Sequence, residues 1–150
     1  MGKRDRATAD SITYQNSTLG VHGHLSIKNF GPSPAFNAYP VIILAPTFKE
    51  LHNAMDSGCE AAKDRFLKGM DVHQPDDQRQ GNNVFPGDII RNGFDAYNYA
   101  AAEPPNPYLG VCMYYRDVFG SVRRTRLCLM SPYGQTPHSL LSCPWYNEAN

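Results

Sequence analysis

The chain has 150 residues, of which 41% are hydrophobic and 19% charged, the size and composition of one globular domain with a single core. Fourteen basic and fourteen acidic side chains cancel, so the net charge gives no reason to expect nucleic acid or anionic lipid as the main partner. The 12 Pro, 12 Gly and 9 Tyr favour strands and turns and argue against a helical bundle.

The first residues have no clear periodic pattern. Residues 1–18 are polar, so we expect a flexible N-terminal arm there, with an edge segment containing a short strand around Ser11 to Tyr14 as the alternative. Residues 19–150 are expected to form a single mostly β domain whose C-terminal tail begins at about residue 131. Apolar and polar residues alternate over 20–28 and predict a half-exposed strand, and the apolar run within 35–44 predicts a strand that is buried on both faces.

One helix is predicted, over residues 47–68. Thr47 and Glu50 have the spacing of a capping box, and Gly69 is a usual terminating residue. Gly58 costs about 1 kcal/mol relative to alanine in a helix, so a break into two shorter helices remains open. Six residues at helical spacing form an apolar face that we expect to lie against the sheet: Phe48, Leu51, Met55, Cys59, Ala62 and Phe66.

The strongest local pattern is a β-hairpin over residues 109–129. Residues 117–120, Asp-Val-Phe-Gly, place Asp and Gly at the first and fourth positions of a type I turn, and Gly120 can adopt the left-handed conformation of the accompanying bulge. A three-residue loop then pairs Val111 with Leu127.

This register predicts different roles for the two faces of the hairpin. The core-facing side chains are Val111, Met113, Leu127 and Leu129. The other face is expected to be the wetter one, where Tyr114 can stack under Arg124 or Arg126. Tyr and Arg are common interface anchors, and the candidate binding residues are therefore Tyr114, Arg116, Arg124 and Arg126.

Four cysteines are candidates for disulfides: Cys59, Cys112, Cys128 and Cys143. An even number in a small chain is compatible with two disulfides in an oxidising compartment, and four buried thiols are the alternative. The expected register leaves Cys112 and Cys128 on a diagonal of about 7 to 8 Å, which disfavours that bridge. Cys59 and Cys143 could pair with each other or with either strand cysteine.

His22 and His24 are the candidates for a metal site, because an H-x-H pair on a strand projects both rings from one face. A third ligand could come from His52, His73 or His138. Since no carboxylate or third histidine has the spacing of a known site, we interpret the pair as part of a solvated strand face, and we predict no metal and no cofactor.

Residues 29–35, Asn-Phe-Gly-Pro-Ser-Pro-Ala, and residues 115–120, Tyr-Arg-Asp-Val-Phe-Gly, form two turn motifs. They resemble the Asn-x-Gly-x-Thr/Ser-Pro-Ala and Tyr-x-Asp-x-Phe-Gly turns of a group of uncharacterised bacterial proteins. The resemblance implies an immunoglobulin-like antiparallel β-sandwich with one inserted α-helix at about residues 47–68. Members of that group commonly carry membrane helices before the sandwich, which implies a place outside the cytoplasmic membrane.

The sequence therefore favours a non-catalytic interaction or structural domain of a bacterial envelope-associated protein. Its expected partner is a protein, and a membrane is contacted only through an anchor outside this chain. The location is periplasmic or extracytoplasmic if such an anchor precedes Met1, and cytoplasmic otherwise. The alternatives are a metal-dependent hydrolase using His22 and His24, a cysteine-dependent hydrolase using Cys112 or Cys128, and a fragment of a membrane-anchored protein.

Overall fold

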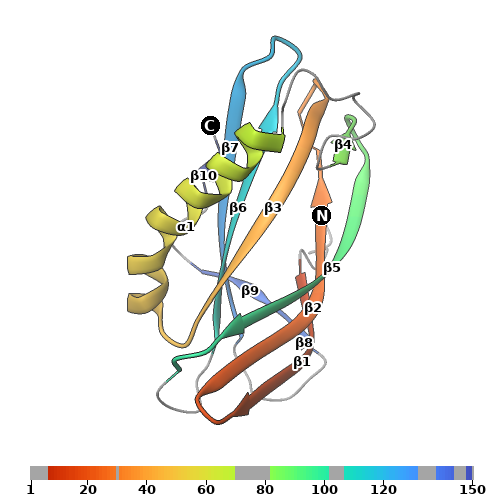
Figure 1. The fold of residues 1–150 in the computed structure, drawn as a ribbon. Coiled ribbons are helices and arrows are strands. Elements are labelled where there is room, and N and C mark those ends of the chain that lie inside the picture. Colours follow the sequence, from red (N-terminus) through yellow and green to blue (C-terminus); the bar gives the residue numbers. More distant parts are fainter. Residues whose placement is uncertain are drawn as a thin grey trace.

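The fold is mostly β, with two antiparallel sheets and one helix, as seen in the computed structural model (Figure 1). The structure describes residues 7–29, 31–69, 82–101, 107–131, 138–143 and 148–149. Residues 1–6 of the predicted arm and most of the predicted tail lie outside these ranges.

The first sheet has the strand order β5-β2-β1-β8 and the second has the order β10-β7-β6-β3-β4, with β9 also paired to β7. The first sheet consists of β1 (Ala7–Gln15), β2 (Thr18–Lys28), β5 (Ile89–Asn98) and β8 (His138–Ser139). The second consists of β3 (Ala35–Ala45), β4 (Asn82–Val84), β6 (Tyr108–Arg116), β7 (Val122–Met130), β9 (Leu141–Ser142) and β10 (Glu148–Ala149). The helix α1 (Phe48–Gly69) covers the outer face of the second sheet, so the molecule has a helix layer and two sheet layers (Figure 1).

Part of the predicted N-terminal arm is strand β1, which pairs with β2 through a two-residue turn. Asn16 and Ser17 have φ values of 50° and 61°, as the type I′ turn of a tight hairpin requires. The pairing shifts by one residue at Asp10, so the inward-facing positions continue from Ala9 to Ile12, three residues later. This bulge breaks the period of two and conceals the strand in the sequence.

Helix α1 is continuous, so the alternative of a break at Gly58 is wrong. The backbone N–H of Glu50 donates to Oγ1 of Thr47 at 3.2 Å, which confirms Thr47 as the N-cap. The predicted apolar face packs on the second sheet, and its members from Leu51 to Phe66 are at most 5% exposed.

Two glycines let the helix approach the sheet closely. A Cβ at Gly58 would overlap Cδ1 of Ile43 in β3. One at Gly110 in β6 would overlap Sδ of Met55, which is fully buried under the helix. Gly58 is therefore retained at the contact with the sheet, where its missing side chain offsets its poor helix propensity.

The β6–β7 hairpin has the predicted register, with Val111 opposite Leu127. Its turn is also confirmed, since the N–H of Gly120 donates to the carbonyl of Asp117 at 3.0 Å and Gly120 has φ 81°. The expectation of a wetter second face is wrong: Tyr114 on that face is only 4% exposed, because α1 covers it.

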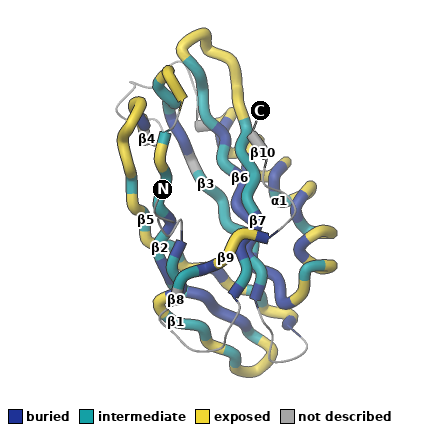
Figure 2. Tube along the Cα trace, turned by 180° about the vertical axis from the view of Figure 1, so that it is seen from behind, coloured by how far each residue is buried: buried dark blue, intermediate teal, exposed yellow. Residues whose placement is uncertain are grey.

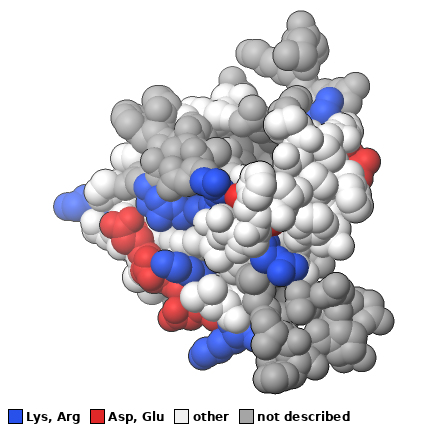
Figure 3. All heavy atoms as spheres, turned by 90° about the horizontal axis from the view of Figure 1, so that it is seen from above, with Lys and Arg blue, Asp and Glu red and all other residues white. Residues whose placement is uncertain are grey.

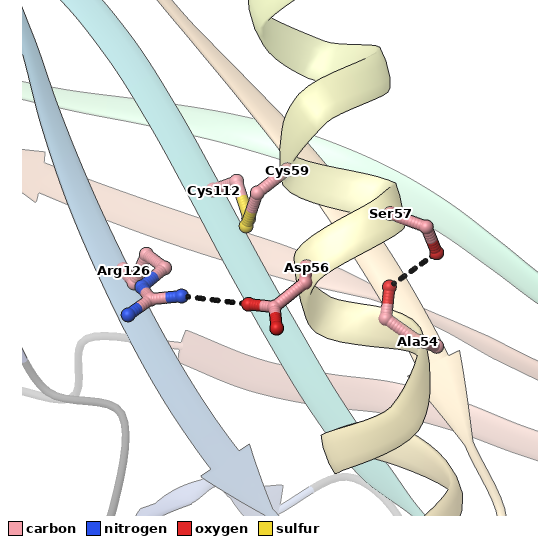
Figure 4. The surroundings of a disulfide bond; sticks show 6 residues. All are labelled: Ala54, Asp56, Ser57, Cys59, Cys112 and Arg126. Atoms are coloured by element: carbon pink, nitrogen blue, oxygen red, sulfur yellow. Dashed lines mark hydrogen bonds and ion pairs between the residues drawn. A yellow bond between two sulfur atoms is a disulfide. The ribbon is translucent and has the colours of Figure 1, made fainter.

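All four cysteines are in disulfides. The bond between Cys59 and Cys112 ties α1 to β6, with a Cα–Cα distance of 5.5 Å (Figure 4). The bond between Cys128 and Cys143 ties β7 to the residue after β9, with a Cα–Cα distance of 5.2 Å. The disfavoured Cys112–Cys128 bridge is absent, because Cys112 lies opposite Arg126 in the hairpin.

The glycine in β2 offers a test of the bulged hairpin. A Cβ at Gly23 would overlap the backbone carbonyl oxygen of Thr8, which the strand pairing holds in place. We expect Gly23→Ala to lower the free energy of unfolding by about 2 to 3 kcal/mol in urea denaturation. Gly93→Ala is the matched control, because a Cβ there is 3.9 Å from the nearest atom. Equal urea concentrations at the midpoint of unfolding for the two variants would contradict the close contact between Gly23 and the carbonyl of Thr8.

The two disulfides close loops of different length, with sequence separations of 53 and 15 residues. By the loop-entropy argument, the longer loop contributes about 4 kcal/mol and the shorter about 3 kcal/mol. We expect the Cys59→Ala/Cys112→Ala protein to unfold at a lower temperature than the Cys128→Ala/Cys143→Ala protein. Thermal melts measured by circular dichroism compare them, and the reverse order would show that packing around the sulfurs outweighs loop closure.

Candidate functional site

The outer face of the first sheet carries the candidate site. In β2, Val21 and Leu25 point between the two sheets, so the alternating residues His22 and His24 point outward. The neighbouring strand β5 has exposed residues at every second position over much of its length (Figure 2). This face is therefore open to solvent, unlike the outer face of the second sheet, on which α1 packs.

Each histidine is paired with an aspartate from an adjacent strand. Nδ1 of His22 lies 2.5 Å from Oδ1 of Asp95, its direct cross-strand partner. Nδ1 of His24 lies 2.6 Å from Oδ2 of Asp10, the bulged residue of β1. The bulge thus brings a carboxylate to His24. Because the four side chains are 35–68% exposed, solvent screens both pairs and they add little to stability.

Two tyrosines extend this surface, Tyr97 in β5 and Tyr99 in the turn that follows it. The rings of Tyr97 and Tyr99 are stacked with centroids 6.0 Å apart, and His22 meets Tyr97 edge-on at 5.5 Å. Tyr97 is 47% exposed and Tyr99 is 76% exposed. Beneath them, the absence of a side chain at Gly20 lets the ring of Tyr97 lie against β2. We call Asp10, His22, His24, Asp95, Tyr97 and Tyr99 the His–Tyr face.

Sequence reasoning identified only the two histidines of this face. Asp95 and Tyr97 alternate along a strand pattern, which is the signal that could have placed them beside β2. Asp10 could not have been placed from a period of two, because its position depends on the bulge.

The His–Tyr face does not complete a metal site within the described residues, which contain no group of three or more His, Cys, Asp and Glu side chains arranged to bind an ion. His52 lies on α1 with its ring 6.3 Å from that of Phe48. His138 lies in β8, and its side chain and all of His73 fall outside the description. Among the described side chains, the structure therefore brings His22 and His24 together without a third histidine.

The predicted binding residues of the hairpin do not form one exposed surface. Tyr114 is buried, and its ring lies 6.2 Å from that of Phe66 on α1. Arg126 is paired with Asp56 of α1 at 3.3 Å, on the same side as the buried disulfide (Figure 4). Arg116 donates to Oδ1 of Asn37 at 3.3 Å, and Arg124 is half-buried. Tyr114 and Arg126 therefore contact the helix, and Arg116 contacts β3.

The tip of the β6–β7 hairpin is held by one carboxylate. Oδ1 of Asp117 accepts the N–H groups of Phe119 and Ser121, both at 2.9 Å. Oδ2 accepts Nε–H of Arg123 at 2.9 Å. Desolvation raises the pKa of Asp117, but the hydrogen bonds from Arg123, Ser121 and Phe119 outweigh it and hold the pKa below its usual value.

Comparison with known protein families, with curated proteins and with solved structures finds no match for the chain. In the part of the chain that the structure describes, α1 is too polar to cross a bilayer and no other helix qualifies. The arrangement of the side chains is therefore the basis for a functional assignment.

The carboxylate of Asp117 predicts a pH dependence of stability. Its pKa is lower in the folded than in the unfolded chain, so its contribution is present above the unfolded pKa and is lost as the pH falls through the folded pKa. We expect Asp117→Asn to lower the melting temperature at neutral pH and to lose less stability than the wild type on acidification. Melting curves across the acid range measure this, and parallel pH profiles for the two proteins would contradict it.

Proposed function

We propose that this chain is a non-catalytic, immunoglobulin-like interaction domain of a bacterial envelope protein, and that it works in an oxidising compartment. The observation that carries the proposal is the pair of disulfides that uses all four cysteines. Disulfides persist in secreted, periplasmic and cell-surface proteins and are rare in the reducing cytosol. All four residues are at most 2% exposed, so the bonds belong to the core. In this state Cys112 and Cys128 offer no thiolate to a cysteine-dependent hydrolase.

The strand arrangement supports the immunoglobulin-like part of the proposal. β1, β2 and β5 share one sheet, while β3, β6 and β7 share the other. Immunoglobulin-like sandwiches divide strands A, B and E from strands C, F and G in the same way. The short β4 beside β3 then corresponds to an extra strand next to C, and α1 is an insertion between these two strands.

The His–Tyr face supports an interaction role and identifies the surface that would meet a protein partner. Tyr97 and Tyr99 present rigid rings with large exposed area, and tyrosine is enriched among the residues that dominate binding energy. His22 and Asp95 beside them supply polar groups for orientation. In this role the face replaces the hairpin residues around Tyr114, which α1 buries.

Thiol counting tests the oxidising compartment. Protein purified from its native location is denatured with a thiol-blocking reagent present and then analysed by mass spectrometry. We expect four unmodified cysteines, and four modified ones only after reduction. Four modified cysteines without reduction would show a reduced chain and would overturn the compartment, whatever the partner is.

A second test concerns the partner. Chemical crosslinking in the native envelope, followed by purification of the tagged chain, recovers the neighbouring proteins. We expect Tyr97→Ala/Tyr99→Ala to reduce a specific crosslinked protein by about 30-fold or more, because each interface tyrosine is worth about 1 to 2 kcal/mol and about 1.4 kcal/mol corresponds to a factor of ten. Leu67→Ser is the matched control, since it removes an exposed apolar side chain from α1, which belongs to neither proposed surface. Equal recovery with the double variant and the wild type would remove the His–Tyr face as the interface.

A further inference from the structure

A second exposed surface lies at the end of the molecule where the β6–β7 hairpin turns (Figure 1). Phe119 is 89% exposed, more than any other large apolar side chain in the described ranges, and Val118 is 48% exposed. The hydrogen bonds of Asp117 fix the turn, so a rigid loop holds the Phe119 ring in water. Such exposure of apolar side chains marks a contact with another molecule.

The corner between β4 and β5 adds apolar side chains at the same end (Figure 1). Phe85 is 49% exposed and Ile89 is 48% exposed. Phe85 packs edge-on against Phe36 at 6.5 Å, and Phe36 pairs with Arg116 at the base of the hairpin tip. The corner and the hairpin therefore adjoin through β3. We call Val118, Phe119, Val122, Phe85 and Ile89 the terminal apolar surface.

The charge around this surface is positive, although the whole chain is neutral. Near the tip, Arg116, Arg123 and Arg124 outnumber Asp117, whereas Arg126 lies farther along β7 and is paired with Asp56. Arg123 is half-exposed beside the tip and paired with Asp117, and at the corner Lys28 pairs across the sheet with Ile89, next to the exposed Asp88. Seen from this end, basic side chains lie next to uncharged surface on one side and next to acidic side chains on the other (Figure 3). Apolar tips with basic neighbours suit an anionic lipid surface.

We propose that the terminal apolar surface docks on an anionic bilayer, with Phe119 and Val118 entering the interface and Arg123 lying at the level of the headgroups. A bilayer surface contacts two separate loops at once, which accounts for Phe85 and Ile89 at the same end. A protein pocket for the hairpin tip alone leaves those two side chains unexplained. This contact is separate from the His–Tyr face and does not depend on the disulfides.

Vesicle sedimentation with the full chain tests the proposal. Vesicles of phosphatidylcholine mixed with phosphatidylglycerol should pellet the wild-type protein, and vesicles of phosphatidylcholine alone should pellet much less. Phe119→Ser should reduce binding about tenfold, since it removes one buried aromatic side chain from the interface. Tyr99→Ser is the control and should bind like the wild type, because it removes an exposed ring from the other surface. Added salt should weaken binding.

Circular dichroism and melting curves establish that each variant is folded, and Val118→Ser provides a second test of the tip if Phe119→Ser is not. Equal sedimentation of wild type and the folded tip variants would overturn the proposal. Failure of the wild type to bind phosphatidylglycerol vesicles would also overturn it. A Phe119-dependent protein crosslink without vesicle binding would assign the tip to a protein pocket instead. None of these outcomes changes the thiol count, so the oxidising compartment is tested independently of the membrane contact.

Discussion

The packing of α1 on the second sheet is the contact on which the rest of the structure depends. The helix buries one face of β3 and β6, and the disulfide between Cys59 and Cys112 fixes it there (Figure 4). Gly58 and Gly110 keep the contact close by leaving room for the side chains of the opposite element. With one face of this sheet covered by the first sheet and the other by the helix, the second sheet becomes the centre of the molecule.

This arrangement decides which residues can meet a partner. On the hairpin, Tyr114 becomes core, and Arg126 turns to Asp56 on the helix. The first sheet has only one face in the core, so its other face keeps His22 and Tyr97 in solvent. Tyrosine and charged side chains on the outer face of the first sheet are therefore available to a partner, whereas those on the helix-covered face of the second sheet stabilise the fold. The exposed surfaces left for the proposed contacts are the outer face of the first sheet and the hairpin end.

Local sequence signals predicted local structure well. The turn at Asp117 and Gly120 set the hairpin register, and that register correctly disfavoured a bridge between Cys112 and Cys128. The capping residue Thr47 correctly predicted where the helix begins, and the spacing of its apolar residues correctly predicted the face that packs on the sheet. Of strand β1, only the part around Ser11 to Tyr14 was considered as a strand, because the bulge at Asp10 interrupts a pattern that depends on strict alternation.

The wrong expectation of a wetter second hairpin face has a different cause, since which face a helix covers is a property of the whole fold. One signal did bear on it: the run from Val41 to Leu44 predicts burial on both faces of β3. In the structure Ile42 packs between the sheets and Val41 packs under the helix. Because Val41 lies opposite Cys112, burial on both faces of β3 implies the same for β6. A strand pattern buried on both faces, together with one amphipathic helix, is thus evidence that the neighbouring strands are covered as well, and polar residues on such strands are poor candidates for a binding surface.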